Sequence, residues 1–318
     1  MLCIRNGLLV LPGGVREADL YIRDDKIFSV GGRWADADVI DASGCRVFPG
    51  FIGLSPAAPD EAVKGSEAAL TGGFTLLPVR CEGELRERMS TDFIRCDDTI
   101  YINADHSDEL RARLSSATQG EVIPVRGVPE EEILSLAGQK GCVLRVGPIR
   151  SREELERVRR ARAAGAAILT ETDERCLTGE AVREDREALL EALLSGEIDL
   201  VSGAPGTLAA RLLPELGKQG SAGLLTAARL LSENPARLLG IYPGRGAIRV
   251  GSVADLVLWD PEYRCPVSGD ELTRRLEGGS AERQSPQGRA KSVLLRGLLS
   301  AGRGMVLRYG LGREIEAL

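Results

Sequence analysis

The chain has 318 residues, of which 43% are apolar and 28% charged, and its formal net charge is −6 at pH 7. This length suits two domains, or one large domain with an annex, and the acidic balance argues against nucleic acid as a main partner. No run of 18 apolar residues occurs and the N-terminus lacks the layout of a signal peptide. We therefore expect a cytoplasmic protein without a membrane span.

The N-terminal residues predict β-structure. Residues 2–10 read as a strand, and residues 18–30 read as a hairpin that turns at Asp24 and Asp25. From Asp60 the apolar period changes, and a helix that ends at Gly72 precedes a buried strand over 74–79.

Helices and strands then alternate through the middle of the chain. Amphipathic helices are predicted over 108–117, 130–141, 151–165 and 183–197. Each is followed by a short apolar run of strand length. This alternation indicates a parallel sheet or a (β/α) barrel. Strands return over 246–262 and 290–310.

The two β-rich ends predict a composite domain, because neither end alone has enough strands for a stable sandwich. We predict an α/β protein with a small β-sandwich domain built from both termini, residues 1–50 plus 241–318. Residues 51–240 then form a (β/α) TIM-type barrel. That stretch is shorter than the roughly 250 residues of a full eight-stranded barrel, so we expect a shortened or incomplete one.

Five segments in order resemble the amidohydrolase superfamily, in particular its dihydroorotase, hydantoinase and allantoinase group. They are IDASGCRVFPGFIGL (40–54), EAALTGGFTLLPV (67–79), REDREALLEALLSGEIDLVSGAPGT (183–207), SENPARLLGIYPGRGAIRVGSVADLVLWDPE (232–262) and SPQGRAKSVLLRGLLSAGRG (285–304). The resemblance implies hydrolysis of a cyclic amide by water activated on one or two zinc ions. It also implies histidines, a carboxylated lysine and an aspartate as metal ligands.

The first-strand ligands of the family are missing. Its D-x-H-x-H motif falls on Gly53, Ser55 and Ala57, so no imidazole remains there.

The later ligand positions also differ. The resemblance places a family histidine on Arg126, a second at or near Pro148, and an additional one on Arg145. The aspartate of the last strand falls on Ser202. These residues are predicted to line a vestigial pocket.

The histidine count supports the same interpretation whatever the alignment. A family site needs roughly four neutral imidazoles, and the chain has one histidine, His106. None of the five lysines falls in a middle-strand context. A zinc site rebuilt from Cys81, Cys96, Cys142 and Cys176 would need these scattered residues to converge. We therefore expect no zinc and no other cofactor.

The leading hypothesis is a dihydroorotase-like protein that no longer catalyses the reaction. The resemblance implies a structural or regulatory role, with aspartate carbamoyltransferase of pyrimidine biosynthesis as a candidate protein partner. A homo-oligomer stays open.

Two alternatives remain. In one, the chain hydrolyses a cyclic amide C–N bond at a rebuilt or metal-free site. Arg126 and Arg145 would bind an anionic ligand there, with Glu171 and Asp173 as their neighbours and His106 as a base. The structural interpretation of the two arginines is that they form ion pairs without a ligand-binding role. In the other alternative, the chain is an active metallohydrolase.

Overall fold

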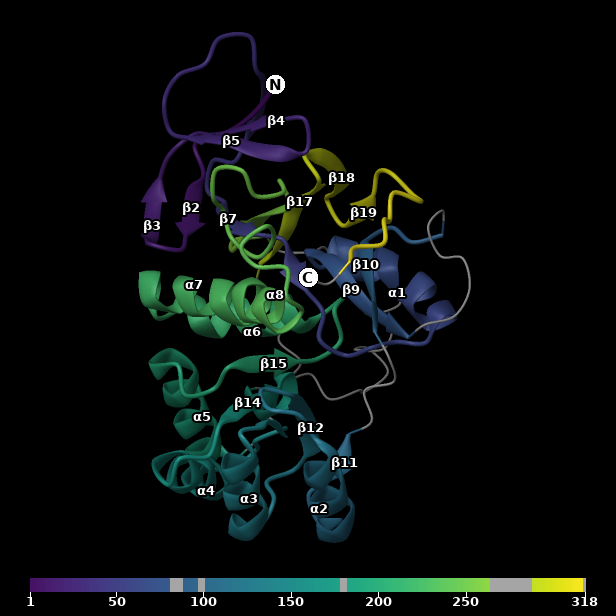
Figure 1. The fold of residues 1–318 in the computed structure, drawn as a ribbon. Coiled ribbons are helices and arrows are strands. Elements are labelled where there is room, and N and C mark those ends of the chain that lie inside the picture. The colour runs from purple at the N-terminus through teal and green to yellow at the C-terminus, as the bar shows by residue number, and fades with distance from the viewer. Residues whose placement is uncertain (81–87, 97–100, 178–181, 264–287, 317–318) are drawn as a thin grey trace, which may run out of the picture. The chain divides into compact units, whose positions relative to one another are not determined.

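The computed structural model describes residues 1–80, 88–96, 101–177, 182–263 and 288–316 (Figure 1). The chain divides into two compact units. Unit 1 comprises Met1–Gly53, Ala57–Arg95 and Ala204–Leu318, and unit 2 comprises Leu54–Pro56 and Cys96–Gly203. No helix among these described residues is long and apolar enough to cross a membrane.

Unit 1 contains the strands from both ends of the chain. One sheet has the order β5 (Lys26–Val30), β4 (Leu20–Arg23), β1 (Leu2–Arg5), β6 (Asp38–Asp41). A second has the order β19 (Met305–Val306), β18 (Leu298–Gly302), β17 (Arg289–Leu295), β16 (Leu256–Asp260), β7 (Arg46–Pro49), β2 (Leu8–Leu11), β3 (Gly14–Glu17).

The two chain ends meet where β7 pairs with β16, with Leu258 opposite Val47. A core of buried aliphatic residues, including Ile4, Leu9 and Leu294, joins both sheets. The predicted joining of the two termini into one strand-rich domain is therefore confirmed.

Unit 1 also holds the first barrel-type elements. Its third sheet has the order β10 (Asp92–Cys96), β9 (Phe74–Arg80), β8 (Phe51–Ile52). Its helices are α1 (Pro59–Thr71), α6 (Leu208–Gly217), α7 (Gly220–Ala228) and α8 (Asn234–Leu238), with a π-helical turn η2 (Arg229–Glu233) before α8.

Unit 2 is a five-stranded parallel sheet. Its strands follow chain order: β11 (Ile102–Asn103), β12 (Val122–Arg126), β13 (Val143–Gly147), β14 (Ile168–Asp173) and β15 (Leu200–Ser202). The connections contain α2 (Ser107–Ser116), α3 (Glu131–Lys140), α4 (Arg152–Ala163), the 3-10 turn η1 (Glu174–Leu177) and α5 (Arg183–Ser195).

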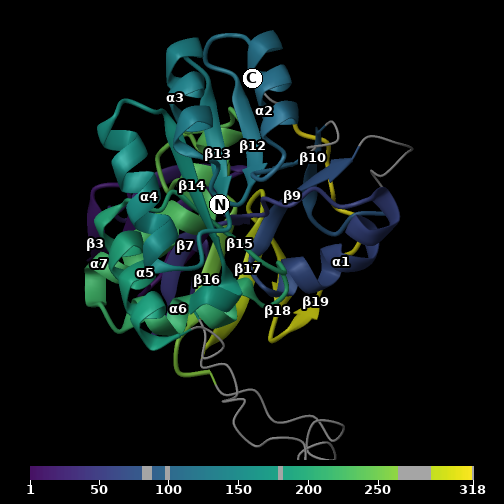
Figure 2. The ribbon, with the colours of Figure 1, turned by 90° about the horizontal axis from the view of Figure 1, so that it is seen from below.

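One face of this sheet is covered by helices. Right-handed crossovers between strands in sequential order place every connecting helix on the same face of the sheet. Figure 2 shows α2–α5 along one side of these strands. Ile123, Val125, Leu144 and Val146 are buried. Because side chains alternate along a strand, the residues between them point to the opposite face.

The units end at other residues than the predicted domains, because β9, β10 and the helices after Gly203 cluster with the terminal strands. The predicted division into 1–50 plus 241–318 and 51–240 remains a prediction.

Gly50, between β7 and β8, allows a close approach of three segments. A Cβ on Gly50 would lie 2.8 Å from Thr75 Cγ2 and 2.9 Å from Asp255 Cβ. We expect Gly50→Ala to lower the free energy of unfolding by about 1–3 kcal/mol, since inserting a methyl group into a filled space forces displacement. Urea denaturation followed by tryptophan fluorescence measures this, because Trp34 and Trp259 both belong to unit 1.

The matched control is Gly65→Ala in α1, where nothing lies within 4 Å of the added Cβ. This change removes a helix-interior glycine and should raise stability by about 0.5–1 kcal/mol. Equal effects of the two substitutions would contradict the close packing at Gly50.

Candidate functional site

The three positions predicted on the first barrel strand carry no metal-binding group in the structure. Gly53 follows β8, and a Cβ there would lie 2.9 Å from Leu77 Cδ2. Ala57 pairs with Val79 through an isolated bridge. Ser55 is exposed. Gly53 and Ala57 belong to unit 1 and Ser55 to unit 2.

The other four predicted positions all belong to unit 2. Arg126 is the last residue of β12, Arg145 is in the middle of β13, Pro148 follows β13, and Ser202 ends β15. The strand register places Arg145 opposite Pro124 and Arg126 opposite Gly147. Arg126 and Arg145 are two positions apart in this register, so both side chains point to the face without helices.

Arg145 and Glu171 form a buried ion pair on that face. Arg145 Nε donates to Glu171 Oε2 at 2.7 Å, and the two side chains are 7% and 8% exposed. A Cβ on Gly147 would lie 2.7 Å from Glu171 Cβ, so the glycine makes room for the backbone and Cβ of Glu171. The structure thus brings together two of the residues that the sequence had placed on neighbouring strands.

Tyr101 joins this cluster, and the sequence had not singled it out. The guanidinium carbons of Arg126 and Arg145 lie 5.7 Å and 5.6 Å from the centroid of its ring. Burial and the nearby Glu171 carboxylate raise the pKa of the Tyr101 phenol, so the hydroxyl stays protonated at neutral pH. Tyr101 lies two residues before Asn103, which pairs with Arg126. No local pattern in the sequence marks Tyr101 as a site residue.

Asp173, the other predicted neighbour, has different partners. Its carboxylate accepts from Arg150 Nη2 at 3.1 Å and from Cys176 Sγ at 3.2 Å. Burial and the adjacent Asp173 raise the pKa of the Cys176 thiol to about 11. Next to Ser202, a Cβ on Gly203 would lie 2.9 Å from Glu174 Cδ, so the Glu174 side chain occupies the space there.

His106 is not in this cluster. It is the N-cap residue of α2, its side chain is 55% exposed, and its Nδ1 lies 3.3 Å from Glu109 Oε2. In the described part of the chain, the His106 side chain makes no hydrogen bond with Arg126 or Arg145.

The residues present do not fit a zinc site of the kind that the resemblance implies. The chain has one histidine, and none of the five lysines lies on β11–β15. Among the described residues no group of three or more His, Cys, Asp or Glu side chains could hold a metal ion. Cys81 lies outside the described residues, and the prediction of a lost zinc site stays a prediction.

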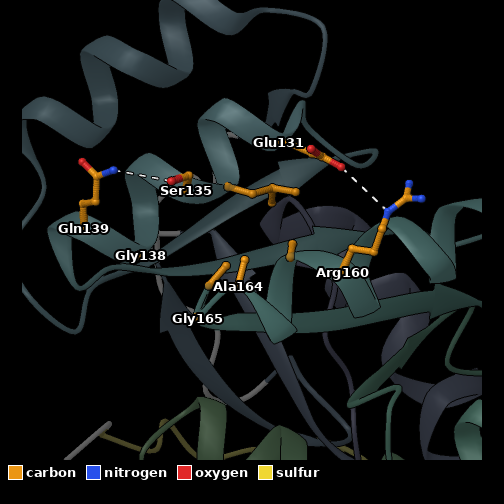
Figure 3. A pocket seen from close by; sticks show the side chains of 10 residues that line it. Glu131, Ser135, Gly138, Gln139, Arg160, Ala164 and Gly165 are labelled. Atoms are coloured by element: carbon orange, nitrogen blue, oxygen red, sulfur yellow. Dashed lines mark hydrogen bonds and ion pairs between the residues drawn. The ribbon is translucent and has the colours of Figure 1, made fainter.

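A hollow of about 630 Å³ lies elsewhere in unit 2, beside α3 and α4 (Figure 3). Its lining is mostly small, with Gly138, Ala164 and Gly165 among its residues. The Glu131–Arg160 ion pair, 3.8 Å between Arg160 Nε and Glu131 Oε1, borders it. None of the predicted site residues lines this hollow.

The chain resembles known proteins along almost its whole length. A model of the amidohydrolase family matches residues 107–293. A dihydroorotase of Caldanaerobacter subterraneus subsp. tengcongensis is 30% identical over 394 positions, covering 85% of this chain and 90% of that protein. A D-hydantoinase of Rhizobium radiobacter is 23% identical over 436 positions, with 95% of both chains covered.

Among solved structures, the dihydropyrimidinase of Brevibacillus agri NCHU1002 superposes with a TM-score of 0.81. It is 19% identical and covers 99% of this chain and 98% of that one. This similarity confirms the predicted TIM-barrel-type domain. Both sequence alignments are longer than the 318 residues of this chain. The chain therefore lacks segments that these relatives have, as a shortened barrel requires.

Proposed function

We propose that this chain, which belongs to the amidohydrolase family, is a dihydroorotase-like member that no longer performs metal-dependent hydrolysis and acts by binding. The observation that carries this proposal is the single histidine, exposed at the start of α2. Zinc hydrolases of this type hold their metal through several imidazoles, which one histidine cannot supply.

A structural or regulatory role with a protein partner is consistent with this loss. Relatives named dihydroorotase reach 30% identity, so aspartate carbamoyltransferase, in pyrimidine biosynthesis in the cytoplasm, is the partner we propose. The buried Arg145–Glu171 pair supports this reading over new chemistry, because it neutralises one of the two arginines.

A second candidate function is hydrolysis of a cyclic amide C–N bond at a metal-free site. It is favoured by the relatives named dihydroorotase and D-hydantoinase and by Arg126, whose guanidinium lies over Tyr101. Such a site would still need a base for the attacking water, and the His106 side chain is exposed and lies beside Glu109.

The test is metal content by mass spectrometry together with turnover of dihydroorotate and hydantoin on the same purified sample. We expect less than stoichiometric zinc and no hydrolysis above the uncatalysed rate. Stoichiometric zinc with turnover would overturn the proposal, and turnover without metal would favour the second candidate.

The partner is tested separately by sedimentation of the chain mixed with purified aspartate carbamoyltransferase from the same organism. A faster-sedimenting complex that contains both proteins is the expected result. Independent sedimentation at micromolar concentrations would remove this enzyme as the partner and leave the loss of hydrolysis unaffected.

A further inference from the structure

The charged residues on the helix-free face of the unit 2 sheet are not explained by stability. Arg145 and Glu171 are each 6% exposed. Removing two charges from water costs about as much as their attraction returns, and apolar residues of similar volume are often as stable or more stable. Stability therefore does not account for these two residues, and their hydrogen-bonding groups indicate another role.

Arg145 Nη2 lies beside the Glu171 carboxylate without an aligned hydrogen bond. Its Nη2 lies 2.7 Å from Glu171 Oε2 as an ion pair, but this atom is buried and makes no hydrogen bond. The same carboxylate oxygen already accepts from Nε. An arginine presents five N–H groups, and buried ones normally find acceptors.

Arg126 and Tyr101 add two further donor groups. Neither the Arg126 guanidinium nor the Tyr101 hydroxyl has a hydrogen bond or an ion pair with any residue in the described parts of the chain. The Arg126 guanidinium carbon lies 5.7 Å from the centroid of the Tyr101 ring. Arg126 is exposed and Tyr101 is half-buried. The cluster therefore combines two cations, one carboxylate and a surplus of donors.

We infer that Arg126, Tyr101 and Arg145 form a binding site for the carboxylate group of a small ligand. A guanidinium fork matches the two oxygens of a carboxylate, and charge-assisted hydrogen bonds of this kind are the strong ones. The inference rests on the loss of metal-dependent hydrolysis proposed above and adds a small-ligand site to the proposed binding of a protein partner. It also adds Tyr101 to the residues of the site.

The charge balance favours a carboxylate over a phosphate. Two guanidinium groups and Glu171 leave one net positive charge, which a carboxylate neutralises. A phosphate carries about −1.5 to −2 at neutral pH, so it would leave an uncompensated negative charge beside Glu171.

The experiment is isothermal titration of the full-length protein with benzoate, a planar monocarboxylate, and separately with inorganic phosphate. We expect saturable one-site binding of benzoate. Arg126→Gln should weaken it by about tenfold or more, because hydrogen bonds to charged groups contribute about this much. Tyr101→Phe, which keeps the ring, should weaken it by about two- to tenfold.

The matched control is Arg150→Gln. Arg150 is also on unit 2, carries the same charge and is already paired with Asp173 at 3.1 Å. We expect a change of about twofold or less, because the Arg150 side chain is 62% exposed and solvated charges interact weakly. Circular dichroism checks that each variant is folded.

Three results would overturn the inference: no saturable binding of benzoate, tighter binding of phosphate than of benzoate, or equal losses in Arg126→Gln and Arg150→Gln. These outcomes are independent of the zinc and turnover assays. Zinc-dependent hydrolysis would contradict the proposed function and leave the test of the carboxylate site unaffected. A protein that neither hydrolyses these substrates nor binds benzoate would contradict the carboxylate site alone.

Discussion

Replacing Asp92 by alanine is expected to lower the free energy of unfolding by about 3–5 kcal/mol, because it leaves buried guanidinium groups without their counter-charge. Asp92 is fully buried in β10. Its carboxylate accepts from Arg245 Nη2 at 2.7 Å, from Arg296 Nη1, and from the backbone N–H of Arg313 at 2.9 Å.

The loss should be large because these groups form one network. Arg245 also pairs with Asp255, and Asp255 accepts from the Arg296 N–H at 2.7 Å. Arg296 Nη2 donates to the Leu311 carbonyl at 2.6 Å. Removing Asp92 leaves two cations with one carboxylate, all within the low-dielectric interior of unit 1.

Urea denaturation followed by tryptophan fluorescence is the measurement, since both tryptophans belong to unit 1. The control is Asp36→Asn at an exposed position of the same unit, which should change stability by no more than about 0.5 kcal/mol. If Asp92→Ala lowered the free energy of unfolding no more than the control does, the network would contribute little to the stability of this fold.

The second prediction concerns the Arg145–Glu171 pair. Glu171→Leu should cost about 3–5 kcal/mol because Arg145 stays buried without a counter-charge. The double variant Arg145→Met/Glu171→Leu should be about as stable as the parent or up to about 4 kcal/mol more stable, because both desolvation costs disappear together. Circular dichroism in urea follows both, since unit 2 contains neither tryptophan.

The double variant also separates stability from ligand binding. It should fold at least as well as the parent and yet bind benzoate more weakly, because Arg145 no longer contributes its Nη2 donor. Equal destabilisation by the single and double substitutions would show instead that the pair itself holds the β13–β14 contact. The interpretation that both arginines are structural would then be favoured over a ligand-binding role.

Much of the fold could be read from the sequence because it depends on local periodicity. The predicted helices at 108–117, 130–141, 151–165 and 183–197 correspond to α2–α5 with ends shifted by a few residues. The turn at Asp24 and Asp25 joins β4 to β5. These elements follow from side-chain spacing and turn residues, which act over a few positions.

The pairing of the chain's two ends was also predictable, although it is not local. Isolated hairpins at either end could not bury an apolar face alone. Joining them was the simplest solution, and β7 next to β16 realises it. The exact division into units was not readable in the same way, because it depends on how many contacts β9, β10 and the later helices make with each side.

For the candidate site, too, some properties were determined by the sequence and others only by the tertiary structure. The sequence alone determined that one histidine and five lysines are available to the whole chain, since a count of ligand types does not depend on folding. It also placed Arg126, Arg145 and Glu171 on neighbouring parallel strands. Only the tertiary structure decided that Glu171 pairs with Arg145, because that choice depends on register and on the space beside Gly147.

Nothing local in the sequence marks Tyr101 or Asp92 as members of a cluster. The contacts of Asp92 with Arg245 and Arg296 span 153 and 204 residues. Contacts over such separations form only when strands from distant parts of the chain are packed. The sequence therefore determined which chemical groups this protein has and which elements carry them, and the packing decided which groups meet, because charge pairing and desolvation act through space.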